Sequence, residues 1–167
     1  MKKYSAGILV YKTDDQNQLM VLLVHPGGPF WAKKDLGAWS VPKGEHEPDE
    51  DPLVTAKREY QEETGQTLPN GEYIDLGKFE RKDGKTISVW AVQGDVDVST
   101  VVSNKFEMEW PPHSGQQQSF PEIDRAGWFL LDEAAMKLSS GQPIFLSRLA
   151  EKLGAEAPSL SEQQHLL

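Results

Sequence analysis

Residues 44–66 read GEHEPDEDPLVTAKREYQEETGQ, and this stretch combines a helix signal with a dense set of acids. Asp51 is a good N-cap residue, and Pro52 stands at the first helical position, where proline is tolerated. Gly65 stands where a glycine commonly ends a helix. We therefore predict a helix over residues 48–64.

Two faces of this helix differ in chemistry. An apolar stripe at i, i+3 and i+7 faces a core and consists of Leu53, Ala56 and Tyr60. Glu59, Glu62 and Glu63 lie at i, i+3 and i+4 on another face. At about 6 Å and an effective dielectric of about 20, one like-charge pair costs roughly 3 kcal/mol, less if it is well solvated. Protons, solvent or divalent metal ions such as Mg²⁺ must offset this repulsion, and a solvated acidic helix face is the competing interpretation.

The acids belong to a longer pattern, G-x5-E-x7-R-E-U-x-E-E-x-G-U, in which U is a bulky apolar residue. Its fixed positions are Gly44, Glu50, Arg58, Glu59, Glu62, Glu63 and Gly65. The stretch resembles the Nudix box, and the Trp128-Phe129-x-Leu131-Asp132-Glu133-Ala134 segment is also similar to a Nudix domain. Two positions depart from the pattern. Tyr60 is a less usual bulky residue, and Gln66 is polar, so we expect looser packing after the helix.

The resemblance implies a role for each matched residue. Glu59 and Glu63 would bind Mg²⁺ or Mn²⁺, and Glu62 would be a further ligand or the base that activates water. The backbone carbonyl of Gly44 would be another ligand. Arg58 would pair with Glu62 or Glu50 and hold the array in place, or form only an ordinary exposed ion pair. Such metals neutralise the charge that develops when a phosphoanhydride is hydrolysed.

Residues around the box suggest how a substrate is held. The Pro42-Lys43-Gly44 tripeptide resembles the Nudix branch that cleaves diadenosine polyphosphates and diphosphoinositol polyphosphates, so Lys43 would contact a phosphate or remain a surface lysine. A tryptophan would stack on a base or pack in the core, and the candidates are Trp31, Trp39 and Trp110. A glutamate from a late loop would be a metal ligand, a base or an ordinary loop acid. Glu122 is our first choice, with Glu107 and Glu109 as alternatives.

Composition excludes several functional classes. The chain has 167 residues, no cysteine and a formal net charge of −9. The missing cysteines exclude disulfide scaffolds, thiolate zinc sites and cysteine nucleophiles, and they favour a cytoplasmic location. The negative charge argues against binding a nucleic-acid polymer, although divalent cations can still bridge the protein to a small phosphorylated molecule. No apolar run reaches the roughly 18 residues of a membrane span.

The order of predicted elements indicates an α+β fold. We expect strands over residues 4–12, 19–25, 38–41, 73–81, 85–94, 106–110 and 126–131. We expect further helices over 132–138, capped by Asp132, and over 143–153. Residues 111–121 are predicted to form a polar loop without structure of its own. The resemblance implies a single Nudix-like α/β/α sandwich over residues 1–154, with a mixed sheet packed between helices and a loose tail over 155–167.

The expected activity is Mg²⁺-dependent hydrolysis of a phosphoanhydride in a nucleoside diphosphate linked to another moiety. The leading substrates are nucleoside triphosphates and dinucleoside polyphosphates. The alternative substrates for an enzyme are nucleotide sugars and inositol pyrophosphates. The non-catalytic alternative is a Nudix-fold module that binds a nucleotide without cleaving it. The sequence leaves the oligomeric state open.

Overall fold

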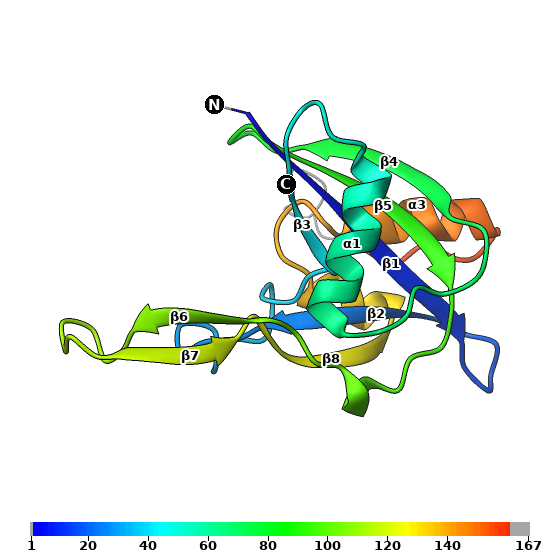
Figure 1. The fold of residues 1–167 in the computed structure, drawn as a ribbon. Coiled ribbons are helices and arrows are strands. Elements are labelled where there is room, and N and C mark those ends of the chain that lie inside the picture. Colours follow the sequence, from blue (N-terminus) through cyan, green and yellow to red (C-terminus); the bar gives the residue numbers. More distant parts are fainter. Residues whose placement is uncertain (1, 161–167) are drawn as a thin grey trace.

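The computed structural model describes residues 2–160 and has a mixed sheet at its centre (Figure 1). Five of the six strands run in the order β4-β5-β1-β2-β8, and β3 pairs with β1 off this path. Their bounds are β1 Lys3–Thr13, β2 Leu19–Pro26, β3 Lys43–His46, β4 Ile74–Glu80, β5 Lys85–Gln93 and β8 Ile123–Leu130. The central β1 pairs parallel with β5 and antiparallel with β2 and β3, which makes the sheet mixed. The predicted α+β class is confirmed.

Helices cover both faces of the sheet (Figure 1). The helices are α1 Pro52–Thr64, α2 Leu131–Lys137 and α3 Ile144–Leu153, with a short 3₁₀ turn η1 at Val98–Thr100. Ala56 and Tyr60 of α1 pack with Ile8 of β1 in one buried cluster. Alternate residues of the same strands pack with α2 and α3 in a second cluster, which includes Leu9 and Phe145. This is the expected α/β/α sandwich.

The segment that leads into α1 differs from the sequence prediction. The helix begins at Pro52 and not at residue 48, because Asp51 accepts the Leu53 N–H at 2.9 Å and caps it there. The preceding residues 43–46 form β3, which the sequence analysis did not predict. Residues 39 and 40 make only isolated bridges, where a strand over 38–41 was expected. Residues 43–46 form a strand because they pair with β1, a contact between segments that are distant in the sequence.

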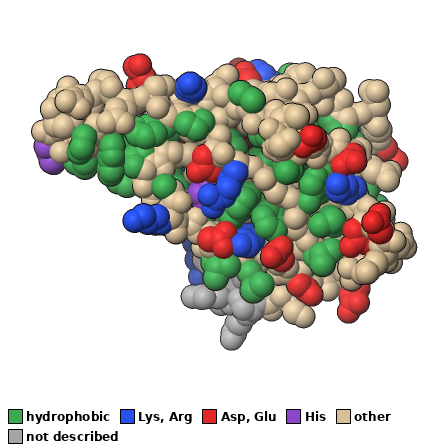
Figure 2. Space-filling model, turned by 90° about the horizontal axis from the view of Figure 1, so that it is seen from below, with side chains coloured by type: hydrophobic (Ala, Val, Ile, Leu, Met, Phe, Trp, Pro, Cys, Tyr) green, Lys and Arg blue, Asp and Glu red, His purple; other side chains and the backbone are tan. Residues whose placement is uncertain are grey.

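The polar loop predicted over residues 111–121 was wrong in its second half. Residues 117–121 form β7 Gln117–Pro121, which pairs antiparallel with β6 Lys105–Glu109 in a separate two-stranded sheet. This hairpin projects from the body of the molecule (Figure 1), and hydrophobic side chains gather along it in Figure 2. Phe106 faces Phe120 across the pair, with ring centroids 6.0 Å apart. Cross-strand packing of this kind stabilises a strand whose own sequence is mostly polar.

The C-terminal elements follow the prediction with one change. Helix α2 begins at Leu131 with Leu130 as N-cap, so Asp132 lies in the first turn and does not cap it. After α3, residues 155–160 form neither helix nor strand, although the Ser159 N–H donates to Asp132 at 3.3 Å and Leu160 packs against the core. The rest of the predicted tail, residues 161–167, lies outside the described residues. Within the described part of the chain, no helix is long and apolar enough to cross a membrane.

Candidate active site

Both ends of α1 are fixed, and this sets the direction of its glutamates. At its C-terminal end Gly65 adopts the left-handed conformation, with φ of 67°, and its N–H donates to the Gln61 carbonyl. A Cβ at this position would lie 2.6 Å from the Val102 carbonyl oxygen, so a larger residue would displace the following segment. The Thr64 carbonyl in turn accepts the Val102 N–H at 2.9 Å. The predicted caps Asp51 and Gly65 are both present.

Glu59 lies directly against the backbone of Gly44. A Cβ at residue 44 would lie 2.1 Å from Cδ and 2.4 Å from Oε1 of Glu59, so only glycine leaves room for this carboxyl group. Partial burial, followed by the negative charge of Glu62, raises the pKa of Glu59, and the charge of Glu122 raises it further. Strand β3 and helix α1 therefore meet at an acid that is desolvated and close to like charges.

Glu63 is the most strongly perturbed acid at this site. Its Oε1 accepts the backbone N–H of Lys43 at 3.2 Å. Burial raises its pKa from 4.5 to about 8 and outweighs the opposing effects of that N–H and of the Lys43 charge. The charges of Glu59 and Glu122 raise the pKa further. The protein alone therefore does not hold Glu63 ionised at neutral pH.

Arg58 lies among three carboxylates. Its guanidinium nitrogens are 3.8 Å from Glu59, 3.9 Å from Glu50 and 4.0 Å from Glu62. The predicted pairing with Glu62 or Glu50 is therefore seen with both residues, and Glu59 is added to them. Each contact is long and Arg58 is half exposed, so these pairs orient the acids more than they stabilise the fold.

Glu122 reaches the box through its backbone. Its N–H donates to the Asn104 carbonyl, its carbonyl accepts the Gly27 N–H, and both distances are 2.8 Å. The Asn104 N–H donates to the Glu62 carbonyl at 3.3 Å, which ties the segment to the last turn of α1. A Cβ on Gly27 would lie 2.0 Å from the Pro121 oxygen, so this approach requires glycine. The Glu122 carboxylate raises the pKa of both Glu59 and Glu63, so it lies within electrostatic reach of both.

The two alternatives to Glu122 lie elsewhere. Glu107 and Glu109 are exposed on β6, and Glu109 accepts the His113 N–H at 2.8 Å within the turn of the hairpin. Neither contributes to the pKa shifts of Glu59 and Glu63. Of the three late acids, only Glu122 is thus brought electrostatically close to the box.

Comparison with known proteins agrees with this arrangement. The family model described as NUDIX domain matches residues 1–149. The chain belongs to the Nudix family. The expected Nudix hydrolase is therefore confirmed at the level of the family.

Three solved structures share the Nudix fold of this chain at low identity. A C. elegans Ap4A hydrolase in a binary complex is 20% identical, with a TM-score of 0.61 over 91% of this chain and 98% of that one. The C-terminal domain of mouse MUTYH in its complex with human PCNA is 20% identical, with a TM-score of 0.61 over 96% and 95%. The NUDIX domain of Shewanella oneidensis NrtR with ADP ribose is 18% identical, with a TM-score of 0.60 over 92% and 89%.

The donor atoms at the Nudix box fit a hard divalent cation. They are carboxylate oxygens with raised pKa values, and a cation would offset the repulsion that raises them. Within residues 2–160, no three acids or histidines converge closely enough to form a ready-made metal cage. Magnesium needs no such cage, because it is usually bound by one or two carboxylates, several waters and the oxygens of a phosphate substrate.

Two of the three candidate tryptophans, Trp31 and Trp39, differ in their exposure. Trp39 is only 5% exposed, its Nε1–H donates to Asp35 at 2.8 Å, and Phe129 packs edge-on against its ring. It is part of the core and offers no free face to a base. Trp31 is 40% exposed, with the Lys34 ammonium 5.0 Å from its ring centroid. Only Trp31 of this pair is available to a ligand.

Sequence analysis missed the residues that hold this Nudix site together. Asn104 and Gly27 position Glu122 through backbone hydrogen bonds, for which no side-chain pattern exists. The one available signal was the Gly27-Gly28 pair, which marks a close backbone approach as well as a turn. Gln66 also differs from expectation. Its amide donates to the Thr100 carbonyl at 3.2 Å and to the Thr100 hydroxyl at 3.1 Å, so a polar tether replaces the loose packing that we predicted.

Proposed function

We propose that this Nudix protein is a hydrolase that cleaves a phosphoanhydride bond in a nucleoside diphosphate linked to another moiety, with Mg²⁺ or Mn²⁺ as cofactor. One observation carries the proposal. Glu59 and Glu63 of α1 and Glu122 from a distant segment form a single electrostatic group, in which Glu59 and Glu63 both have a raised pKa. Strongly perturbed acids of this kind are typical of sites that hold a cation or move a proton.

The residues of the chain would divide the work. Glu59 and Glu63, with the carbonyl of Gly44, would hold the cation, which supplies charge neutralisation at the phosphate oxygens. Arg58 would keep the acids in register through its contacts with Glu50, Glu59 and Glu62. Glu122 would accept the proton of the attacking water. Its charge raises the pKa of both cation-holding acids, and it comes from a separate element of the chain. Glu62 is the alternative base, although its charge raises the pKa of Glu59 alone and it lies beside Arg58.

The substrate would be a phosphorylated small molecule, and a nucleotide fits best. Two Nudix-fold neighbours support this class, because one is named as an Ap4A hydrolase and the other was solved with ADP ribose. On this chain Lys43 would contact a phosphate, since its ammonium is close enough to Glu63 to lower the pKa of that residue. The half-exposed face of Trp31 would stack on a base.

A substrate panel with Mg²⁺ tests the proposal. The panel contains a nucleoside triphosphate, diadenosine tetraphosphate, ADP-ribose, a nucleotide sugar and a diphosphoinositol polyphosphate, and product masses identify the bond that breaks. Glu63→Gln should abolish turnover, and the matched control Glu133→Gln, on an exposed residue of α2, should not. If a nucleotide binds but nothing in the panel is cleaved, the chain is a nucleotide-binding module and the hydrolase proposal fails.

A further inference from the structure

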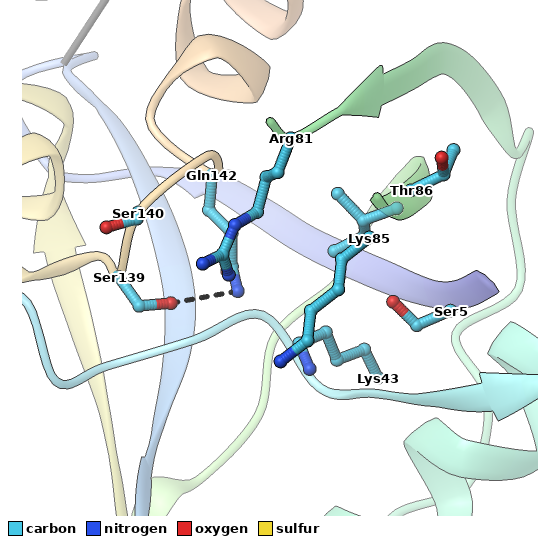
Figure 3. A pocket seen from close by; sticks show the side chains of 9 residues that line it. Ser5, Lys43, Arg81, Lys85, Thr86, Ser139, Ser140 and Gln142 are labelled. Atoms are coloured by element: carbon cyan, nitrogen blue, oxygen red, sulfur yellow. Dashed lines mark hydrogen bonds between the residues drawn. The ribbon is translucent and has the colours of Figure 1, made fainter. Parts of the chain in front are cut away.

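A second pocket lies on the other side of β3 from the acids. It has a volume of about 120 Å³, and three cations line it, namely Lys43, Arg81 and Lys85 (Figure 3). Lys43 begins β3, whereas Arg81 and Lys85 flank the turn between β4 and β5. The serines of the loop between α2 and α3 close the pocket on the opposite side (Figure 3). Two segments that are distant in sequence thus place positive charge in one pocket.

This concentration of cations needs compensation. The chain as a whole carries a net charge of −9, yet in the described part of the chain Lys43 and Lys85 have no ion pair. Arg81 is paired with Asp83 at 2.9 Å, which leaves other N–H groups of its guanidinium free to donate. Like charges around a small pocket repel one another, and a bound anion would relieve that repulsion.

The neutral lining adds hydrogen-bond donors. Gln142 is 3% exposed, and its amide is saturated, because it accepts the Val41 N–H at 2.9 Å and donates to the hydroxyls of Ser40 and Ser139 at 3.0 and 3.1 Å. The Ser139 oxygen therefore acts as an acceptor toward Gln142, and its own O–H remains available to the pocket (Figure 3). None of the residues around the pocket is aromatic, so it has no platform for a base. This chemistry suits a phosphate oxygen.

Lys43 belongs to both sites. Its backbone N–H donates to Glu63 on the acid side, and its side chain lines the cationic pocket. Successive residues of a strand point to opposite faces, so Gly44 meets Glu59 while Lys43 turns the other way. A row of substrate phosphates that passes Lys43 would therefore meet both sites. One end would contact the acids through a divalent cation, and the other end would contact the pocket directly.

We propose that this pocket binds a phosphate group of the substrate that lies beyond the bond being cleaved. The inference rests on the proposed hydrolase function and narrows its substrate class. The preferred substrate carries a polyphosphate chain or a multiply phosphorylated ring, and compounds with only the two bridging phosphates, such as ADP-ribose or nucleotide sugars, are poor substrates. Arg81 and Lys85 are then the specificity-determining residues.

Steady-state kinetics test the substrate preference. The Arg81→Ala/Lys85→Ala double variant is compared with Lys82→Ala, which removes an exposed lysine of the same turn from outside the pocket. For adenosine 5′-tetraphosphate and for a diphosphoinositol polyphosphate, we expect KM of the double variant to rise about tenfold or more while kcat changes less than about twofold. The KM for ADP-ribose and all parameters of Lys82→Ala should stay unchanged. The two polyphosphate substrates show whether a chain or a ring is preferred.

Calorimetry with inorganic tripolyphosphate in EDTA tests the pocket without the reaction. We expect wild type and Glu63→Gln to bind it alike, the double variant to bind about tenfold more weakly, and tripolyphosphate to compete with the tetraphosphate substrate. Equal affinity in the double variant, non-competitive inhibition, or an equal rise of KM for ADP-ribose would overturn the inference. If the whole panel resists hydrolysis, the proposed function fails, and the calorimetry still decides whether the pocket binds phosphate.

Discussion

The two sides of β3 show opposite electrostatic designs built from adjacent residues. On one side Gly44 makes room for Glu59, and there Glu59 and Glu63 are partly buried and repel each other, so that the pKa of Glu63 rises to about 8. On the other side Lys43 faces Arg81 and Lys85 in a pocket lined by donors. The acid side needs a cation and the basic side needs an anion. A phosphorylated substrate with a divalent metal supplies both, whereas a neutral ligand supplies neither and a cationic ligand supplies only the first.

The largest effect is expected from Glu63→Gln, which removes the ionisable carboxyl group but keeps the shape of the side chain. We expect kcat to fall by about 1000-fold, because a group that holds the transition-state charge is lost. In EDTA at pH 8 the same variant should be more stable than wild type by roughly 3 kcal/mol, because glutamine does not ionise and avoids the cost of a buried carboxylate. Turnover assays and urea unfolding measure the two quantities. A variant with near wild-type kcat would contradict the assignment of the acid side.

Gly44→Ala tests the contact between β3 and α1 directly. The added Cβ would lie 2.1 Å from Cδ of Glu59, so this carboxyl group must move. We expect kcat to fall by about 100-fold, as is typical when a catalytic group is misplaced by about 1 Å. Gly71→Ala is the matched control, since its Cβ would meet Val92 at an ordinary 3.4 Å. Equal kinetics for the two alanine variants would show that Glu59 does not need its place beside residue 44.

The pH dependence of stability follows from the raised pKa of Glu63. Between pH 4.5 and about 8 the folded protein holds a proton on Glu63 that the unfolded chain releases. The free energy of unfolding in EDTA should therefore decrease as pH rises through this window, by roughly 1 kcal/mol per pH unit, and should level off above it. Urea titrations at several pH values measure the slope. Glu63→Gln should flatten it, and an unchanged slope in that variant would assign the titration to another group.

Glu122→Gln and Glu62→Gln distinguish the two candidate bases by which neighbouring acids each of them affects. Removal of the Glu122 charge should lower the pKa of both Glu59 and Glu63, since it now raises both. Removal of the Glu62 charge should lower the pKa of Glu59 alone. Carboxyl NMR titration of the metal-free protein measures both changes. If Glu122→Gln leaves the pKa of Glu63 unchanged, the assignment of Glu122 to the acid site is disproved.

Lys43→Ala is expected to have the smallest effect, and it acts on both sides of β3. The backbone N–H to Glu63 remains while the ammonium is lost, so the pKa of Glu63 should rise. The affinity for tripolyphosphate should decrease by several-fold, because one of the three cations is removed. NMR titration and calorimetry check the pair of effects. A change on one side only would show that Lys43 does not connect the two sites.

The sequence by itself determined the box helix and its acids. Asp51, Pro52 and Gly65 act through neighbours within a few residues, and the 3.6-residue period assigns Tyr60 and Glu63 to different faces. The positions of α1, the β4–β5 hairpin and α3 along the chain were predictable for the same reason, since caps, turns and hydrophobic periods are local.

Only the tertiary structure decided what meets these acids. Strand β3 exists because residues 43–46 pair with β1, and β7 exists because Phe120 packs across from Phe106. Glu122 reaches the box through Asn104 and Gly27, and Arg81 and Lys85 meet Lys43 because β1 lies between β3 and β5. These contacts join segments tens of residues apart through backbone hydrogen bonds and strand register. Such bonds are available to almost any residue, so they leave no pattern in the sequence.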